Sequence, residues 1–283
     1  MKPAGSYFGV VFVFTTFALV LYYTGYVSLG PVVQRERALT FLGFLPDRVL
    51  FSHMLFRYMK IAVVLGLACW IFHFALPFSA WLTFAAFSVL MCQTIESAYY
   101  TVHIYHIAYV SLLVVTFWYT LEYRELRRFR TAAQLYNAQY PEWLFFVPFF
   151  YLVVTYSYSG IIKLTRNGFG WINGTSLQLW VLMIGDSQSL ATKLMVSSRT
   201  VALLVQISTL VFESTAFLTL WFRRLRPAYG VALIGMHLGV EMIFGFSFWG
   251  NIAMDFLLLV IYPLLGQSTQ LSNFDPSRLE VAN

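Results

Sequence analysis

Long apolar runs limit most strongly what this chain can fold into. A helix that crosses a bilayer needs about 20 apolar residues in succession. Eight such runs occur, at 7–29, 56–76, 78–95, 99–121, 143–164, 200–222, 228–247 and 250–266. Only 11% of residues are charged, whereas an average soluble domain has about 25%. We therefore predict an all-α fold, a polytopic membrane helix bundle of about eight transmembrane helices in one domain, 1–266, followed by a polar tail, 267–283.

The arginines predict how these helices are oriented. Two clusters are separated by an even number of predicted helices: Arg124, Arg127, Arg128 and Arg130, and Arg223, Arg224 and Arg226. Because basic residues collect on the cytoplasmic side, we expect both termini to be cytoplasmic. The basic residues from Arg35 to Lys60 then fall at the outer face, against the same rule. The alternative is that one of the helices predicted at 56–76, 78–95 and 99–121 is re-entrant, which would change their side. The segment from Leu164 to Thr200 is too polar to cross and should lie along the outer interface.

Charge and cysteine content exclude several functions. The net charge is +6, but the arginines lie in clusters beside apolar runs and form no aromatic-interleaved basic face. We therefore expect the lipid bilayer, and no nucleic acid, as a partner. Cys69 and Cys92 lie inside apolar runs and form no CxxC motif. The sequence thus supports neither a disulfide framework nor a dithiol redox centre.

Polar residues inside the predicted helices need an explanation, because a charged side chain there costs roughly 2.5–3.5 kcal/mol on insertion scales. On the helix predicted at 99–121, a polar stripe runs at helical spacing. It contains Glu96, Tyr99, His103, His106 and Tyr109. His103 and His106 could share a metal ion, but five histidines in the chain are too few for a histidine-rich di-iron site. We favour histidines that are satisfied within the bundle and expect no metal.

Lys163 closes the helix predicted at 143–164, and Tyr156, Ser159 and Gly160 share its face. Small residues let a neighbouring backbone come close, so the ammonium could be held in a tight, partly dehydrated pocket. Desolvation disfavours the charged form and would make the amine a usable base. The alternative is a lysine at a helix end that snorkels to water, which its position alone favours.

Three further polar residues lie within predicted helices. Glu213 is in the middle of 200–222, while His237 and Glu241 lie one turn apart on 228–247. A buried network that only fixes helix register explains them as well as a functional cavity does. In the predicted orientation, however, Lys163 and the polar residues of 99–121 and 228–247 all fall in the outer half of the bilayer. This shared depth favours a cavity with acid and base groups, open outward or sideways to lipid.

The run Tyr156–Leu164, followed by Trp171 and Gly174, resembles a signature of the HTTM family, the horizontally transferred transmembrane domains of vitamin K-dependent gamma-carboxylase type. Two further blocks agree in content and order. His106 precedes Leu112 and Leu113, and Glu213 precedes the pair His237-Leu238 by 24 positions. The resemblance covers roughly residues 50–265 and, with three blocks in register, is fairly specific.

The resemblance implies a membrane enzyme with lyase-type chemistry. Lys163 would be the catalytic base that deprotonates a reduced naphthoquinone of the vitamin K or menaquinone type. Reaction with O2 then yields the epoxide and a strong base that removes a carbon-bound proton, with CO2 as a further reactant where the product is a carboxylate. His106 would handle the resulting carbanion, and His237 with Glu213 would be a structural or proton-handling pair. His103, Tyr156 and Glu241 complete the supporting polar network.

The sequence departs from the family pattern at several positions. Ile162 replaces the first lysine of the usual pair, Tyr105 replaces an asparagine, and Trp171 lies farther from the lysine than in the carboxylase. The gamma-carboxylase also has a large lumenal domain for its protein substrate, while this sequence ends soon after the last predicted helix. We therefore expect a small or peptide substrate. The competing hypothesis is a non-catalytic membrane partner that matures or exports a secreted peptide.

Overall fold

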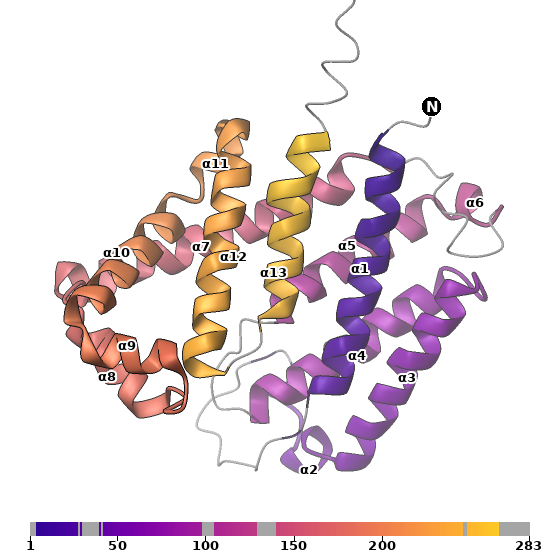
Figure 1. Ribbon diagram of the computed structural model, residues 1–283. Helices are drawn as coiled ribbons and strands as arrows, with labels where there is room; N and C mark the ends of the chain where they lie inside the picture. Colours follow the sequence, from indigo (N-terminus) through magenta and orange to yellow (C-terminus); the bar gives the residue numbers. More distant parts are fainter. Residues whose placement is uncertain are drawn as a thin grey trace, which may run out of the picture. The chain divides into compact units, whose positions relative to one another are not determined.

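The computed structural model describes residues 4–27, 29, 40, 42–97, 105–128, 140–245 and 248–265. Every regular element in these ranges is a helix (Figure 1), which confirms the predicted all-α class. The chain divides into two compact units, Met1–Leu144 and Phe145–Asn283, hereafter the first and the second unit. The predicted tail and His103 lie outside the described residues.

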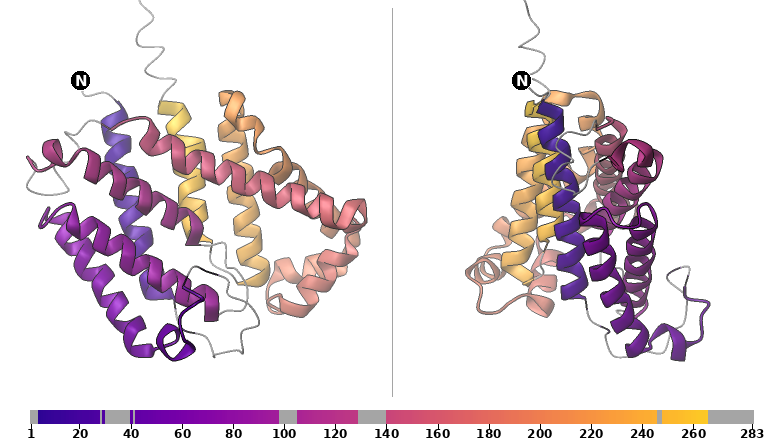
Figure 2. Two further views of the ribbon diagram at one scale, coloured as in Figure 1. Left: turned by 180° about the vertical axis from the view of Figure 1, so that it is seen from behind. Right: turned by 90° about the vertical axis from the view of Figure 1, so that its right-hand side faces the viewer.

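The first unit is built on four helices: α1 (Ala4–Tyr26), α3 (His53–Ile71), α4 (Phe78–Ser97) and α5 (His106–Leu121). The short helix α2 (Asp47–Leu50) precedes α3, and the short helix α6 (Tyr123–Leu126) follows α5. Helices α3 and α4 form an antiparallel hairpin (Figures 1 and 2). Its core contains Trp70, whose ring packs 4.8 Å from that of Phe17 and 4.9 Å from that of Tyr119. Aromatic packing thus joins α3 to both α1 and α5.

The second unit contains the candidate site. Its elements are α7 (Trp143–Asn167), η3 (Gly168–Trp171), α8 (Thr175–Ile184), α9 (Leu190–Ser197), α10 (Arg199–Thr215), α11 (Leu218–Trp221), η4 (Arg223–Leu225), α12 (Arg226–Phe244), α13 (Trp249–Asp255) and the π-helical turn η5 (Phe256–Ile261). Helices α12 and α13 lie side by side, and α7 crosses them at a steep angle (Figures 1 and 2). Helices α8 and α9 pack at the C-terminal end of α12.

Each of the eight predicted runs contains a helix. Among the described residues, five helices are long and apolar enough to cross a membrane, namely α1, α3, α4, α7 and the η4–α12 segment. A sixth candidate is the pair α9 and α10, if the two are counted as one span despite a bend of 105°. Helix α5 and the segment Trp249–Leu265 are apolar but shorter. The described helices therefore indicate a membrane protein.

The distribution of polar and apolar side chains agrees with this conclusion. Leu65, Phe146 and Val231 lie within apolar helices and are each more than half exposed. Glu96 and Asp255, in contrast, are at most 4% exposed. Apolar side chains on the outside and polar ones inside are expected where hydrocarbon replaces water as the solvent.

The predicted polar stripe along one helix is wrong. Helix α4 runs through Glu96 to Ser97, and α5 begins only at His106. The Glu96 carboxylate accepts hydrogen bonds from the backbone N–H of Thr40 at 2.6 Å and from its hydroxyl at 2.8 Å. Glu96 thus holds the segment before α2. The sequence could not show the break, because two successive helices have the same periodicity.

Arg226 also has a structural role, besides belonging to an arginine cluster that predicts how the helices are oriented in the membrane. It is 8% exposed, and its Nε donates a hydrogen bond to the backbone oxygen of Thr219 at 2.9 Å. Its guanidinium lies 4.3 Å from the centre of the Phe149 ring. Arg226 therefore fixes the start of α12 against α7, whereas the neighbouring Arg224 is exposed.

We expect Arg226→Ala to lower the free energy of unfolding by about 2 kcal/mol, because it removes a buried charged hydrogen bond and a cation–π contact. Arg224→Ala removes the same charge from the same cluster and should change stability by less than about 0.5 kcal/mol. Thermal or denaturant unfolding of the purified protein in detergent measures both effects. Equal losses in the two variants would show that only the cluster's charge matters.

Candidate functional site

One face of α7 carries the candidate site, and its closest approach to another helix is at Gly160. A β-carbon at this position would lie 2.3 Å from the backbone nitrogen of Ser214 and 2.8 Å from the carbonyl carbon of Glu213. These are backbone atoms of α10, so no side-chain movement could relieve the overlap. The glycine lets α7 and α10 meet backbone to backbone, as the small face of α7 predicts.

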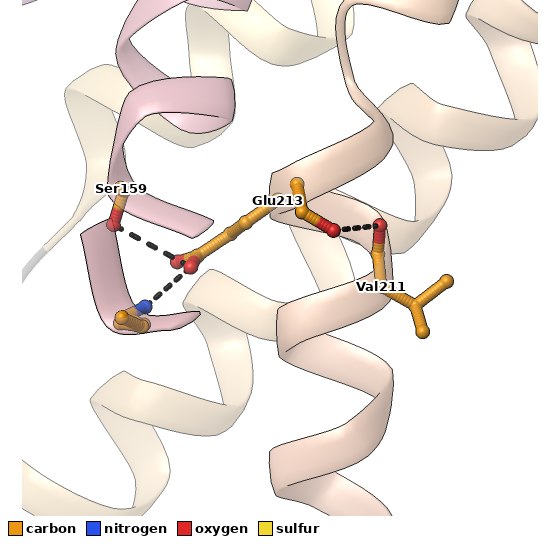
Figure 3. Close-up of polar contacts among 5 residues, drawn as sticks. Ser159, Val211 and Glu213 are labelled. Carbon is orange, nitrogen blue, oxygen red and sulfur yellow. Dashed lines mark hydrogen bonds and ion pairs between the residues drawn. The ribbon is translucent and has the colours of Figure 1, made fainter. Parts of the chain in front are cut away.

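This close approach brings Lys163 of α7 to Glu213 of α10. Lys163 Nζ and Glu213 Oε2 form an ion pair, and the Ser159 hydroxyl donates to the same oxygen at 3.4 Å. The Glu213 side chain reaches across to α7 at the level of Ser159 (Figure 3). Lys163 Nζ also lies 5.7 Å from the centre of the Trp171 ring. The side chains of Lys163 and Glu213 are 28% and 8% exposed, so the pair is largely shielded.

The loop that carries Trp171 is fixed to α10 by Gln206, which is 2% exposed. Gln206 Oε1 accepts from the backbone N–H of Gly174 at 2.7 Å, and its Nε2 donates to the Trp171 carbonyl at 3.0 Å. Nε2 also donates to the Ser176 hydroxyl at 2.9 Å. One buried side chain therefore satisfies three groups of the loop and holds the indole beside the lysine.

A cavity of about 380 Å³ opens beside this pair. Its polar lining comes from Lys163, Ser176 and Gln206, and its apolar lining consists of Trp171, Leu177, Trp180, Ile184, Val240 and Phe244. The exposed side chains of Trp180 and Ile184 place its mouth at the surface. Its volume lies within the range of roughly 300–1,000 Å³ that is typical of small-molecule sites. An apolar chamber with one cationic group at its wall can hold a flat, lipid-soluble molecule with a polar edge.

A second cluster lies two turns earlier on α7. The Tyr156 hydroxyl is 2.6 Å from His237 Nε2 and 3.0 Å from Asp255 Oδ2. Asp255 is fully buried, and the His237 ring stacks on Phe248 with 4.9 Å between ring centres. A phenol has one proton, so it donates to one neighbour and accepts from the other. With a carboxylate at Asp255, Tyr156 donates to Asp255 and accepts from the Nε2–H of His237.

Three buried polar atoms around this cluster make no hydrogen bond with the described residues. They are His237 Nδ1, Glu241 Oε2 and Asn251 Oδ1. Glu241 lies one turn beyond His237 on α12, and Asn251 lies one turn before Asp255 on α13. If His237 donates through Nε2, its Nδ1 is an acceptor, as are the other two atoms. The three atoms can therefore receive hydrogen bonds from a proton-bearing group.

In the second unit, the structure separates the predicted site residues into two clusters, one with Lys163 and Glu213 and one with Tyr156 and His237. Glu213, expected to pair with His237, contacts Lys163 instead, and His237 contacts Tyr156 and Asp255. His106 is the first residue of α5 and belongs to the first unit. Its predicted partnership with Lys163 therefore stays a prediction.

Asp255 was missed in the sequence, although the signal was present. It is a carboxylate inside the predicted helix 250–266, and the same rule selected Glu213. Asp255 lies where α13 passes into the π-helical turn η5, a local distortion that is frequent at functional sites. In the part of the chain that the structure describes, no three histidine, cysteine or carboxylate side chains gather as a metal site would require.

Gly160→Ala should separate α7 from α10 and lower the unfolding free energy by about 1–3 kcal/mol, as overpacking does. The control is Gly235→Ala on α12, where nothing lies within 4 Å of an added β-carbon. This substitution should be neutral or slightly stabilising. Thermal unfolding of both variants in the same detergent measures the difference. If both melted like the wild type, the backbone contact at Gly160 would not exist.

Comparisons with known proteins leave the function to be argued from this geometry. No family model, no curated protein and no solved structure matches the chain. The HTTM resemblance therefore depends on the motif residues themselves.

Proposed function

We propose that this chain is an integral membrane enzyme of the HTTM, gamma-carboxylase-like type. In this proposal, Lys163 is the base toward a reduced naphthoquinone of the vitamin K or menaquinone type, with O2 as co-substrate. The oxygenation is coupled to proton abstraction from, or carboxylation of, a small or peptide substrate. The observation that carries the proposal is that Lys163, in a shielded ion pair with Glu213, lines a cavity of about 380 Å³ that has aromatic side chains in its wall.

The lining of the cavity suits a quinol. Trp171, Trp180 and Phe244 offer aromatic surface to a flat apolar ring, and Lys163 is the cationic group for a hydroxyl at the ring's edge. When bound, the quinol would supply, together with O2, the strong base of the reaction and leave as the epoxide. A chamber walled mainly by apolar side chains limits access of water to such a base.

The ion pair can deliver the neutral amine that a base requires. In the proposed reaction, the proton of the Lys163 ammonium passes to the Glu213 carboxylate, which leaves a neutral amine. The neutral amine then accepts the proton of the quinol hydroxyl, and the ammonium that forms stabilises the quinol oxygen. Ser159, through its hydrogen bond to Glu213, keeps the carboxylate directed at the lysine.

The decisive experiment supplies reduced menaquinone or vitamin K under oxygen to the protein in nanodiscs and measures the epoxide by mass spectrometry. We expect epoxide from the wild type and a rate at least about 100-fold lower from Lys163→Ala, the size of a general base contribution. Lys193→Ala, which removes an exposed lysine on α9, should leave the rate unchanged. Epoxide that forms equally fast in Lys163→Ala would assign the base elsewhere.

Folding has to be separated from catalysis in this test. Lys163→Ala leaves the Glu213 carboxylate buried without its partner, which is itself destabilising. The double variant Lys163→Ala with Glu213→Ala removes both charges and should recover stability but not activity. A well-folded wild type that gives no epoxide with either quinol would favour the competing role, a maturation or export partner for a peptide.

We also propose that the eight helical segments all cross the membrane, with both termini cytoplasmic. Helix α5 and the segment Trp249–Leu265 have 16 and 17 residues, near the lower limit of about 17 for a span. The 24 residues of Trp143–Arg166 allow α7 to cross with a tilt. The arginine clusters after α5 and after α11 then lie on the same, cytoplasmic side.

Cysteine labelling tests this topology in a variant that lacks Cys69 and Cys92. A cysteine in place of Ser187, between α8 and α9, should react with a membrane-impermeant maleimide added outside intact cells. A cysteine in place of Ser272 should react only after permeabilisation. Labelling of both positions from the same side would contradict the three crossings, α10, α12 and the segment Trp249–Leu265, that this topology places after α9.

A further inference from the structure

A second cavity, of about 350 Å³, lies in the first unit, between the C-terminal end of α1 and the middle of α3. It is lined by Leu21, Thr24, Gly25, Lys60, Ile61, Val64 and Leu65. The site proposed around Lys163 uses none of these residues. What this cavity binds is therefore a separate question.

The apolar wall of this cavity faces outward. Leu21, Ile61, Val64 and Leu65 are between 45% and 58% exposed. These four residues come from α1 and α3, both of which are long and apolar enough to cross a membrane. An exposed apolar groove between two such helices meets acyl chains when the protein is in a bilayer.

Lys60 gives the groove a charged end. Its Nζ donates to the backbone oxygen of Val27 at 2.6 Å and is 3.5 Å from that of Gly25. The ammonium thereby covers carbonyls at the end of α1, where a helix has no internal donors left. It also has a third N–H group. Within the described residues no carboxylate lies at ion-pair distance of Lys60. Its ammonium contacts the two carbonyl oxygens and the ring of Phe56, whose centre is 5.1 Å away.

Arg57 adds a second cation at the same end. It precedes Lys60 by three residues on α3, so the two side chains are neighbours on the helix surface. Arg57 is exposed and makes no ion pair with the part of the chain that the structure describes. The positive-inside rule does not account for these two cations, because the predicted orientation puts them at the outer face. An anion bound from outside the chain would account for them.

We propose that this groove is a binding site for an anionic phospholipid. Lys60 and Arg57 bind the phosphate, and one acyl chain lies along the groove formed by Leu21, Ile61, Val64 and Leu65. A free phosphate ion would use the two cations and leave the apolar wall without a ligand, so the combined chemistry fits a lipid. Basic residues at a membrane surface attract anionic headgroups in this way.

Native mass spectrometry of the full chain, delipidated in detergent, tests the proposal. The probes are dioleoyl phosphatidylglycerol and dioleoyl phosphatidylcholine, which have the same acyl chains, and inorganic phosphate. We expect the wild type to bind the first phosphatidylglycerol at least about fivefold more tightly than phosphatidylcholine. Lys60→Gln and Arg57→Gln should each remove most of this preference, about fivefold in affinity, while the exposed control Lys193→Gln should keep it.

Val64→Trp tests the apolar part of the site and leaves the hydrogen bonds between Lys60 and the carbonyls at the end of α1 in place. The indole should fill the groove and weaken binding of phosphatidylglycerol by at least about tenfold, since the acyl chain loses its place. Equal affinity for the two lipids, or Lys60→Gln and Arg57→Gln variants that bind like the wild type, would overturn the proposal. Competition by millimolar phosphate, together with unchanged binding by Val64→Trp, would assign a simple anion site and overturn the lipid as well.

Discussion

Buried polar groups in an apolar chain have to satisfy one another, and in the second unit one face of α7 meets this constraint. Gly160 lets the backbones of α7 and α10 come together, so Lys163 reaches Glu213. Two turns earlier, Tyr156 of the same face reaches His237 and Asp255. The positions of α10, α12 and α13 against α7 therefore depend on these polar contacts, because the hydrocarbon of a bilayer offers such groups no hydrogen-bond partners.

The membrane-protein class could be predicted from the sequence because it depends on composition and run length alone. All eight apolar runs contain helices, yet the stripe from Glu96 to Tyr109 was assigned to one helix when it belongs to two. Two successive helices both repeat polar and apolar residues every 3.6 positions, so this repeat does not show where one helix ends and the next begins. Helix existence could therefore be predicted, while the break between α4 and α5 could not.

The sequence singled out individual polar residues of the second unit, but it did not show which of them are in contact. Lys163, Glu213 and His237 were selected because each is a polar residue inside an apolar run, and Tyr156 because it shares the helix face of Lys163. Which of them touch depends on helix rotation and crossing, so the partner of Glu213 was misassigned and Asp255 was overlooked. The small residue Gly160 was the one sequence feature that carried information about contact, because it limits how close a second backbone can come.

The two clusters on α7 differ in how far their side chains are exposed, and this difference suggests different roles. The side chains of His237 and Asp255 are 5% and 0% exposed, whereas that of Lys163 is 28% exposed and lines the cavity. A sealed polar cluster can hold three helices in register but cannot meet a substrate, while a pair at a cavity wall can exchange a proton with what enters. Because α7 carries both, any shift of the sealed cluster along the helix axis would move Lys163 relative to Trp171. In the proposed reaction, Tyr156, His237 and Asp255 would therefore be positioning residues for Lys163.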